Sequence, residues 1–255
     1  MKNTYTITSN TKIAAGVFRM ELAGDTSLFK RPGQFVNIAL DGFYLRRPIS
    51  VCDWNDEGFT IVYKVFGDGT EHMSTLPCGA QLDILVGLGN GFDVDKAGDR
   101  PLLVGGGVGV PPLYGLAKQL GVRSVESGVE KPTVLLGFRT PEDVFYVDEF
   151  EALGCEVHVF LSSEGKRVTD FAGLKERDAE GVVPYGFSYF YACGPDGMLK
   201  ALAQTLPMDG ELSFEERMPC GFGLCMSCTC RTKSGAIKLC CQGPVIPKGE
   251  VLVEE

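Results

Sequence analysis

Hydrophobic residues in the first part of the chain occur in short runs that are separated by turn-forming residues. Two apolar or β-branched runs, 34–40 and 59–66, are bounded by clusters of Gly, Asp, Asn and Pro. Short runs broken in this way are typical of antiparallel sheets. We therefore expect residues 1–97 to form an antiparallel β-barrel or sandwich.

The pattern changes at Asp99-Arg100-Pro101, after which strand-like apolar runs alternate with segments of helical character. This alternation predicts an α/β unit with a doubly wound parallel sheet. From residue 211 onward the chain has few helix signals and many cysteines, so we expect three units, residues 1–97, 98–210 and 211–255. The expected strands of the second unit are 102–104, 133–138, 156–160 and 189–193, and its expected helices are 113–120, 147–153 and 196–206.

The composition limits the classes of partner. The 255 residues carry a net charge of −9, which argues against binding to a nucleic-acid backbone, because neutralising phosphates needs a dense basic surface. No segment approaches the roughly 20 apolar residues that cross a bilayer, and the N-terminus lacks the apolar core of a signal peptide. We expect a cytoplasmic protein without a membrane or nucleic-acid partner.

Cysteine is concentrated near the C-terminus. Six of the 10 cysteines fall within 22 residues, and in a reducing compartment such a cluster indicates metal binding rather than a disulfide framework. Only two histidines are present, so a metal site here is expected to be rich in thiolate ligands. The six residues are Cys220, Cys225, Cys228, Cys230, Cys240 and Cys241.

The spacing of four of these cysteines predicts an iron–sulfur cluster. Four residues separate Cys220 from Cys225, two separate Cys225 from Cys228, and Cys240 follows after eleven more. This spacing matches the plant-type [2Fe–2S] ligand pattern. The alternative is a four-cysteine zinc site, which usually shows two close Cys-x-x-Cys pairs where this chain has one.

Two glycine-containing turns follow strands of the expected α/β unit. The segment 105–112 leaves a strand and opens a helix, as in turns that hold a pyrophosphate on backbone amides and a helix N-terminus. Val110 occupies the third glycine position of the dinucleotide fingerprint, so a merely tight turn is the alternative. The second turn, Cys193-Gly194-Pro195, also lies between a strand and a helix. Two turns at carboxyl ends of strands would flank one ligand crevice, although a simple helix start also explains the second.

The first unit contains two further candidate binding segments. In Arg46-Arg47-Pro48-Ile49-Ser50, consecutive arginines beside a proline and a hydroxyl residue suit a ligand that carries phosphate or an isoalloxazine ring, since guanidinium forms bidentate phosphate contacts. A solvated surface arginine is the alternative for either residue. The segment Gly67-Asp68-Gly69-Thr70 is either an amide-rich binding turn or an ordinary hairpin.

Taken together and in this order, these motifs resemble the electron-transfer subunit of the two-subunit, NAD-dependent dihydroorotate dehydrogenases, within the ferredoxin–NADP reductase superfamily. The resemblance covers essentially the whole chain. It implies an FAD-binding antiparallel barrel, a nucleotide-binding α/β domain and a C-terminal [2Fe–2S] module. The cofactor-binding residues that it implies are Arg47, Pro48, Ile49 and Ser50 beside the flavin, Val62, Tyr63 and Lys64 on the strand that lines it, Gly69 and Thr70 at the FAD pyrophosphate, and Gly105, Gly107, Gly109, Cys193, Gly194 and Pro195 at the nicotinamide nucleotide.

The most specific part of the resemblance is the segment 215–228, which is similar to the family's Glu-x-Arg-Met-x-Cys-Gly-x-Gly-x-Cys-x-x-Cys sequence. It implies Cys220, Cys225 and Cys228 as cluster ligands. The family's last ligand lies in Cys-x-Asp-Gly-Pro, where this chain has Gln242 in place of the acid. Register makes Cys240 that ligand, with Cys241 and Cys230 as possible substitutes.

The function implied by the resemblance is electron transfer within a larger enzyme. An FMN-containing catalytic subunit would oxidise dihydroorotate, and electrons would pass through [2Fe–2S] and FAD to NAD⁺ in a heterotetramer with two copies of each subunit. No residue of this chain is then expected to be catalytic toward dihydroorotate. The alternatives are an electron-transfer subunit of a hydrogenase, a sulfide dehydrogenase or a bifurcating transhydrogenase, and a zinc-stabilised binding module.

Preference between NAD and NADP is left open by the sequence. Glu164, after the third strand of the α/β unit, would favour an unphosphorylated ribose, but a solvated loop carboxylate is an equal alternative. Arg139 and Arg167 are basic residues near this segment whose directions the sequence does not give.

Overall fold

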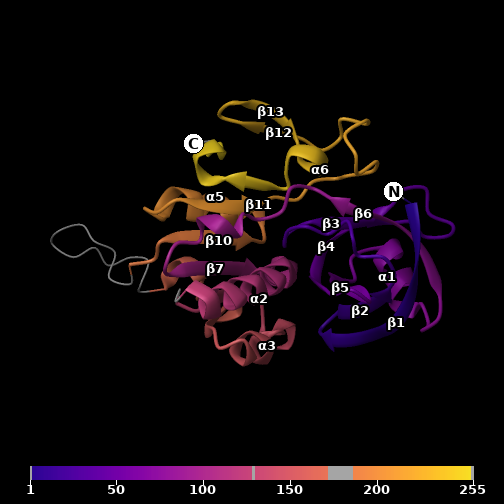
Figure 1. Ribbon diagram of the computed structural model, residues 1–255, viewed down its shortest axis with the longest axis horizontal. Coiled ribbons are helices and arrows are strands. Elements are labelled where there is room, and N and C mark those ends of the chain that lie inside the picture. Colours follow the sequence, from indigo (N-terminus) through magenta and orange to yellow (C-terminus); the bar gives the residue numbers. More distant parts are fainter. Residues whose placement is uncertain (1, 128–129, 172–185, 254–255) are drawn as a thin grey trace.

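The N-terminal unit is a closed antiparallel barrel, as the short alternating runs predict. The computed structural model describes residues 2–127, 130–171 and 186–253, and Figure 1 shows the barrel beside the α/β unit. Neighbouring strands follow the order β1-β2-β5-β4-β3-β6 around the barrel. Their bounds are β1 Lys2–Ala14, β2 Val17–Ala23, β3 Phe35–Ile38, β4 Arg47–Trp54, β5 Gly58–Lys64 and β6 Gln81–Leu88.

Alternate residues of these strands fill the barrel, because successive side chains of a strand point to opposite faces. Val36 and Ile38 of β3 point into the core, whereas Asn37 between them is turned out of the barrel toward the C-terminal segment. Helix α1, Asp68–Thr75, follows β5 directly. The turn at Gly67 is therefore a helix start rather than a hairpin.

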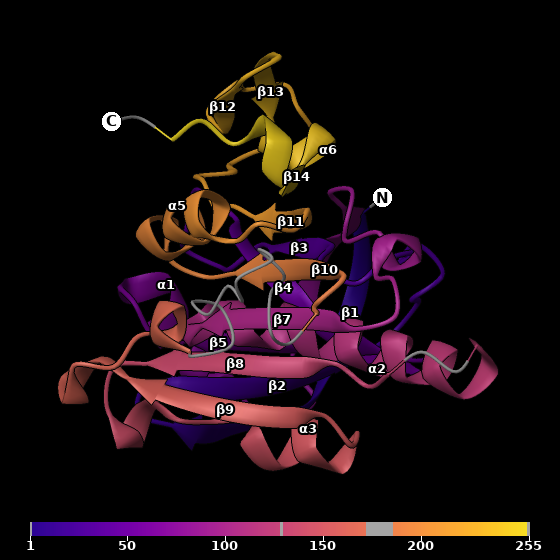
Figure 2. The same cartoon turned by 90° about the vertical axis from the view of Figure 1, so that its left-hand side faces the viewer.

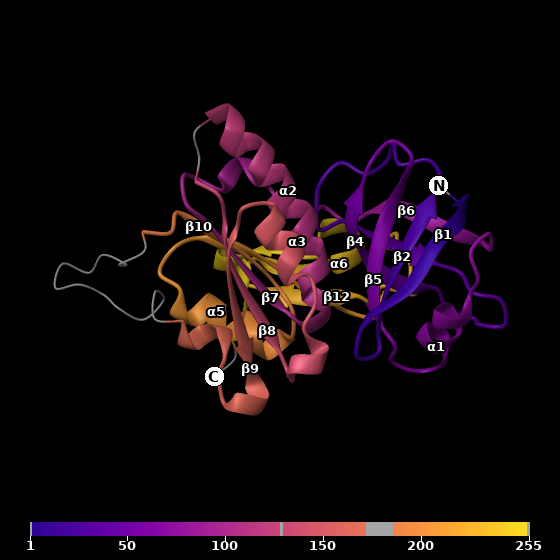
Figure 3. The same cartoon turned by 90° about the horizontal axis from the view of Figure 1, so that it is seen from below.

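The second unit is a doubly wound α/β sheet, as expected. Its six strands follow the order β14-β11-β10-β7-β8-β9 and are parallel except for β14. Figures 2 and 3 show α2 and α3 on the face toward the barrel and α5 on the opposite face. The strands are β7 Pro101–Gly106, β8 Thr133–Phe138, β9 Glu156–Leu161, β10 Tyr189–Cys193, β11 Gly210–Ser213 and β14 Val245–Pro247, and the helices are α2 Val110–Ser127, α3 Val147–Ala152 and α5 Asp196–Thr205.

Short 3₁₀ turns occupy several of the connections, including the loop between β7 and α2. They are η1 Val94–Lys96, η2 Gly107–Gly109, η3 Pro141–Asp143, η4 Ser162–Glu164, η5 Val168–Asp170 and η6 Lys248–Glu250. The helices of the part that the structure describes include none that is long and apolar enough to cross a membrane.

The cysteine-rich segment connects two neighbouring strands of this sheet, β11 and β14. The chain leaves at the end of β11, forms the hairpin β12 (Thr229–Thr232) and β13 (Gly235–Lys238) and the short helix α6 (Leu239–Gln242), and returns as β14 beside β11. Its base is bonded to the barrel, since the amide of Asn37 donates to the Met218 carbonyl at 3.0 Å. The backbone N–H of Asn90 donates to the Gly243 carbonyl at 2.7 Å. The cysteine-rich segment is therefore held against the end of β6.

Helix α2 joins the barrel to the α/β unit. A Cβ atom at Gly115 would lie 2.5 Å from the Cys52 carbonyl oxygen of β4, so only glycine permits this approach. One turn further on, Lys118 forms a 2.6 Å ion pair with Asp53. The buried Cys52 thiol also lies 3.4 Å from the Tyr146 hydroxyl, and burial raises its pKa to about 12. The groups at the centre of this contact between the barrel and the α/β unit are thus uncharged and closely packed.

We expect Gly115→Ala to destabilise the protein. The added methyl group would push α2 away from the Cys52 carbonyl, and overpacking of this kind costs about 1–3 kcal/mol. Gly121→Ala on the same helix is the matched control, because its Cβ would meet no atom within 4 Å. Helix propensity alone favours alanine at both positions. Thermal unfolding should show a lower midpoint for Gly115→Ala and an unchanged or higher one for Gly121→Ala; equal midpoints would contradict the contact.

Candidate functional site

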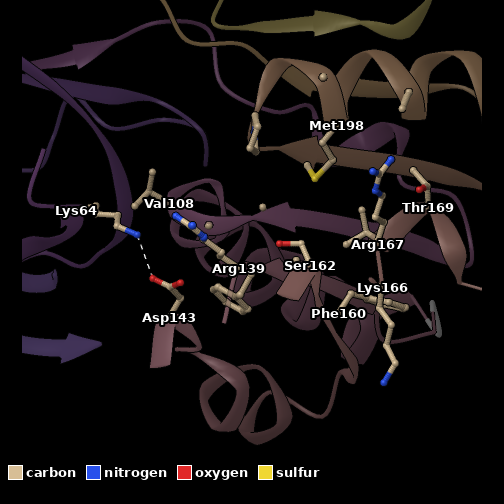
Figure 4. A pocket seen from close by; sticks show the side chains of 18 of the residues that line it. Lys64, Val108, Arg139, Asp143, Phe160, Ser162, Lys166, Arg167, Thr169 and Met198 are labelled. Carbon is tan, nitrogen blue, oxygen red and sulfur yellow. Dashed lines mark hydrogen bonds and ion pairs between the residues drawn. The ribbon is translucent and has the colours of Figure 1, made fainter. Parts of the chain in front are cut away.

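A pocket of about 550 Å³ opens where the parallel strands end. The carboxyl ends of β7, β8, β9 and β10 border it, which is where ligands bind in open α/β sheets. Its lining also includes Val17 and Lys64 of the barrel. Figure 4 shows the side chains from these elements around one cavity. Because both units contribute residues to its lining, the pocket lies at the boundary between the barrel and the α/β unit.

The two glycine-containing turns that the sequence singles out meet at this pocket. A Cβ at Gly109 would lie 2.2 Å from the Cys193 carbonyl oxygen, and one at Gly194 would lie 3.0 Å from the Cα of Gly106. The turns are therefore packed backbone to backbone. Gly105 is next to Val110, whose side chain would be 2.9 Å from an added Cβ. Val110 thus fills the space behind the loop, which explains a valine at the third glycine position.

The rest of this loop faces the cavity. Gly107 has a φ of +52° with no atom within 4 Å of its Cβ position, and it lines the pocket together with Pro195. Cys193 is buried, and burial raises the pKa of its thiol to about 12. The thiol is therefore uncharged near neutral pH, and this turn offers backbone groups rather than a nucleophile.

The three predicted residues of β5 point in different directions. Val62 packs in the core between barrel and sheet, and Tyr63 points into the barrel, where its hydroxyl donates to Asn10 Oδ1 at 3.0 Å. Lys64 alone reaches the pocket, where it forms a 3.1 Å ion pair with Asp143. Burial alone would raise the pKa of Asp143, but its contacts with Lys64 and Thr140 lower it. The pair links barrel and sheet at one end of the pocket.

The structure assigns different surroundings to the two consecutive arginines. Arg46 is tied into the barrel by an ion pair with Asp83 at 2.9 Å and by bonds to two backbone carbonyls. Arg47 has its guanidinium over the Phe43 ring at 4.7 Å and donates to the Leu45 carbonyl. Of the two, Arg47 is the one without a carboxylate partner among the described residues.

Arg47 and the start of α1 form a cradle for an anion. A Cβ at Gly69 would lie 2.1 Å from Arg47 Nε, so the guanidinium lies directly against the helix start. The Thr70 hydroxyl orders the turn by accepting from Phe66 N at 2.7 Å and donating to the Gly67 carbonyl at 3.0 Å. A guanidinium beside free amides of a helix start fits the pyrophosphate of a dinucleotide such as FAD. The half-buried Pro48, Ile49 and Ser50 continue along β4 from this cradle.

The cysteine loop is wrapped by residues with left-handed backbone. Gly221 and Gly223 have φ of +77° and +85°, and Met226 has a φ of +63°. The wrapping turns amides toward sulfur. Burial would raise the pKa of the Cys220 thiol, but hydrogen bonds from the N–H groups of Cys225, Phe222 and Leu224 lower it to about 6. A loop that stabilises thiolate in this way suits a metal centre.

The four predicted ligands fall into two pairs. The side chain of Cys225 is one of the groups that lower the pKa of the Cys220 thiol, and Cys228 Sγ lies 3.2 Å from Cys240 Sγ. Gly223 N donates to Cys240 Sγ at 3.1 Å and so brings the pairs together. Among the described residues, no three metal-binding side chains converge on a single ion position. Two thiol pairs fit a binuclear cluster, in which each iron takes two cysteines, better than one zinc ion.

The remaining two cysteines of the segment are placed differently. Cys241 is exposed, with its Sγ 3.7 Å from Cys240 Sγ, whereas Cys240 is buried against Cys228. Cys230 lies on β12 and lines a smaller pocket with Lys200 and Phe214. The geometry therefore favours Cys240 as the fourth ligand.

Sequence reasoning did not identify several residues of the main pocket. Asp143, Phe160 and Ser162 line it, although no motif marks them. Asp143 follows the end of β8 by a few residues, and Ser162 directly follows the last residue of β9. That position is the signal that would have found them.

The family model and the curated relatives agree on one family. Residues 215–252 match the family model described as the iron–sulfur cluster binding domain of dihydroorotate dehydrogenase B. A protein of Lysinibacillus sphaericus is 42% identical over 96% of this chain and 96% of its own length, and it is named dihydroorotate dehydrogenase B (NAD(+)), electron transfer subunit. A Geobacillus protein of the same name is 43% identical, with 97% of each chain covered.

Solved structures share the fold. A chain from the structure of the NADH-dependent reduced ferredoxin–NADP oxidoreductase superposes with a TM-score of 0.77 at 30% identity, covering 97% of this chain and 89% of its own. Phthalate dioxygenase reductase superposes with a TM-score of 0.63 at 19% identity, covering 92% and 87%. The expected barrel and α/β architecture is thereby confirmed.

Replacing Cys240 with serine should remove iron and the visible absorption of an iron–sulfur cluster, because this buried thiol lies beside Cys228. Cys241→Ser is the matched control and should keep both, since the Cys241 side chain is exposed to solvent. Iron analysis and an absorption spectrum of the purified variants measure this. Iron loss in Cys241→Ser with a tolerated Cys240→Ser would reassign the fourth ligand.

Proposed function

The chain belongs to the family of electron-transfer subunits of NAD-dependent dihydroorotate dehydrogenase B, and on this premise we propose that it carries electrons from a catalytic subunit to NAD⁺. The bound cofactors supply the redox chemistry, which is hydride exchange with the nicotinamide and single-electron exchange with the partner. The residues of this chain bind the cofactors, keep them apart and hold them in the order in which electrons pass between them.

We assign three binding regions to the chain. FAD lies on the barrel unit, residues 1–97, with its pyrophosphate at Arg47 and Gly69-Thr70. The nicotinamide nucleotide lies in the pocket of residues 98–210, on the two packed turns. The cluster is held in residues 211–255 by Cys220, Cys225, Cys228 and Cys240, and β14 ties this last region back to the sheet.

One observation carries the proposal: the barrel touches both of the other sites. Lys64 of the barrel lines the pocket, and Asn37 of the barrel bonds to Met218 just before the cysteine loop. Strand β4, with Pro48 and Ser50, pairs with β3, where Asn37 lies opposite Pro48. A flavin on β4 would therefore lie between nucleotide and cluster, as an adapter between two-electron and one-electron carriers requires.

The exposed side of the cysteine loop is the proposed contact with the catalytic subunit. Phe222, Leu224 and Met226 have 53%, 76% and 54% of their surfaces exposed. Apolar side chains gathered on one exposed loop mark protein contacts. A partner that covers them would come close to the cluster. We propose that this partner contains FMN, oxidises dihydroorotate, and forms a cytoplasmic heterotetramer with two copies of each subunit.

A second function is favoured by the 30% identical chain of the NADH-dependent reduced ferredoxin–NADP oxidoreductase. A subunit of a bifurcating transhydrogenase would use the same three regions with a different partner. The two functions differ in the protein that docks on the cysteine loop, so reconstitution separates them.

The isolated protein should reduce an artificial acceptor with NADH but should fail to oxidise dihydroorotate. Adding the FMN-containing catalytic subunit should establish electron flow from dihydroorotate to NAD⁺, which is measured as NADH absorbance under anaerobic conditions. Dihydroorotate oxidation by the isolated chain, or failure of any FMN subunit to couple, would contradict the proposal.

Within the same assay, Leu224→Ser should weaken coupling to the catalytic subunit at least severalfold, because the leucine side chain is proposed to be buried by the partner. Reduction of the artificial acceptor should not change. Val122→Ser, on an exposed site of α2 away from the cysteine loop, is the matched control. Equal coupling by both variants would move the docking surface elsewhere.

A further inference from the structure

The side chain of Lys238 is bonded to the cysteine loop. Lys238 is half-buried where β13 meets α6 (Figure 1), and its Nζ donates to the Gly223 carbonyl at 3.0 Å. A Cβ at Gly223 would lie 3.7 Å from Lys238 Cδ, so the aliphatic stem also rests on the loop. The ammonium group is therefore held against the loop that carries three of the predicted cluster ligands.

This bond connects Lys238 to the sulfur atoms of two predicted ligands. The Gly223 carbonyl belongs to the same peptide group as the N–H of Leu224, which donates to Cys220. A cation at the carbonyl end of a peptide group polarises it and strengthens the hydrogen bond at its N–H end. The N–H of Gly223 itself donates to Cys240 Sγ at 3.1 Å. Lys238 thus acts on Cys220 through one peptide group and lies beside the donor to Cys240.

The charge of Lys238 is not compensated by a neighbouring acid. Lys238 forms no ion pair with the residues that the structure describes. Its backbone N–H donates to Gln242 Oε1 at 3.0 Å, and Gln242 is a neutral residue in place of the acid in the family's ligand sequence. A carboxylate at this position would lie beside Lys238 and offset its charge. The amide leaves a net positive charge at the loop.

We propose that Lys238 raises the reduction potential of the [2Fe–2S] cluster and so favours its reduced state. This role rests on the proposed function, which places the cluster on these cysteines. In the reduction, one electron passes from reduced FAD or from the partner to one ferric iron. The thiolates already make the cluster anionic, so a nearby cation stabilises the reduced state more than the oxidised one. Lys238 therefore sets the level at which the cluster exchanges electrons with FAD.

The test is a redox titration of the full holoprotein, with FAD and cluster bound, followed by the electron paramagnetic resonance signal of the reduced cluster. Lys238→Gln should lower the equilibrium constant for cluster reduction about fivefold or more, because a unit charge near the cluster is lost. Lys238→Arg keeps the charge and should remain within about twofold of wild type. Lys233→Gln, on the exposed turn of the same hairpin, is the matched control and should also remain within about twofold.

A second variant changes the charge and leaves Lys238 in place. Gln242→Glu keeps the Oε1 acceptor and adds a negative charge beside the lysine, so it should lower the equilibrium constant about threefold or more. The differences of both variants from wild type should shrink at high salt, because screening weakens charge effects and leaves packing effects unchanged.

Wild-type equilibrium constants in Lys238→Gln and Gln242→Glu, each with its iron retained, would overturn this role, as would an equal decrease in Lys238→Arg and Lys238→Gln. If Lys238→Gln loses its iron, Gln242→Glu decides by the same criterion. A cluster that is present but insensitive to these charges would leave the proposed function standing. Absence of a cluster from the wild-type protein would refute the proposed function itself.

Discussion

The contact between helix α2 and barrel strand β4 is the constraint on which the arrangement of sites depends. Helix α2 begins at the glycine loop, and Gly115 within it rests on the Cys52 carbonyl of the strand that starts at Arg47. A helix and a strand are both stiff. One close contact between them therefore fixes the glycine loop, which precedes α2, relative to the anion cradle at Arg47, where β4 begins. The ion pairs Lys118–Asp53 and Lys64–Asp143 also join the two units, but the close contact at Gly115 already sets their relative position.

The cysteine segment is held by a different device. Asn90 follows the barrel and bonds to the chain on both sides of the cis Gly243-Pro244 peptide through its backbone and its side chain. The neighbouring strand β14 completes the sheet. Helix α6, with Cys240, therefore has its base fixed to both units, while the loop from Cys220 to Cys228 leaves its apolar side exposed. That combination suits a site that is rigid toward the flavin and open toward a partner.

The parts of the fold and of the candidate site that depend on local residue patterns could be predicted from the sequence. The glycine turns, the Cys220-Cys225-Cys228 spacing and the alternation of strands and helices depend on residues close together in the chain. What the sequence could not give depends on distant partners. Arg46 is paired with Asp83, Arg47 has no carboxylate partner in the part of the chain that the structure describes, and Asp143 in the pocket is paired with Lys64 of the barrel. The Gly67 turn could start a helix or a hairpin, and only the packed structure selects the helix.

We propose that electrons cross the chain in one order, from nucleotide to flavin to cluster to partner, or the reverse. The most direct test mixes NADH anaerobically with wild-type protein and with Cys228→Ser, each bound to the catalytic subunit, and follows flavin bleaching and FMN reduction in time. We expect rapid bleaching of the FAD in both proteins and reduction of the FMN only in the wild type. FMN reduction at the wild-type rate in Cys228→Ser, with its iron lost, would show that electrons bypass the cysteine loop and would rule out this order of transfer.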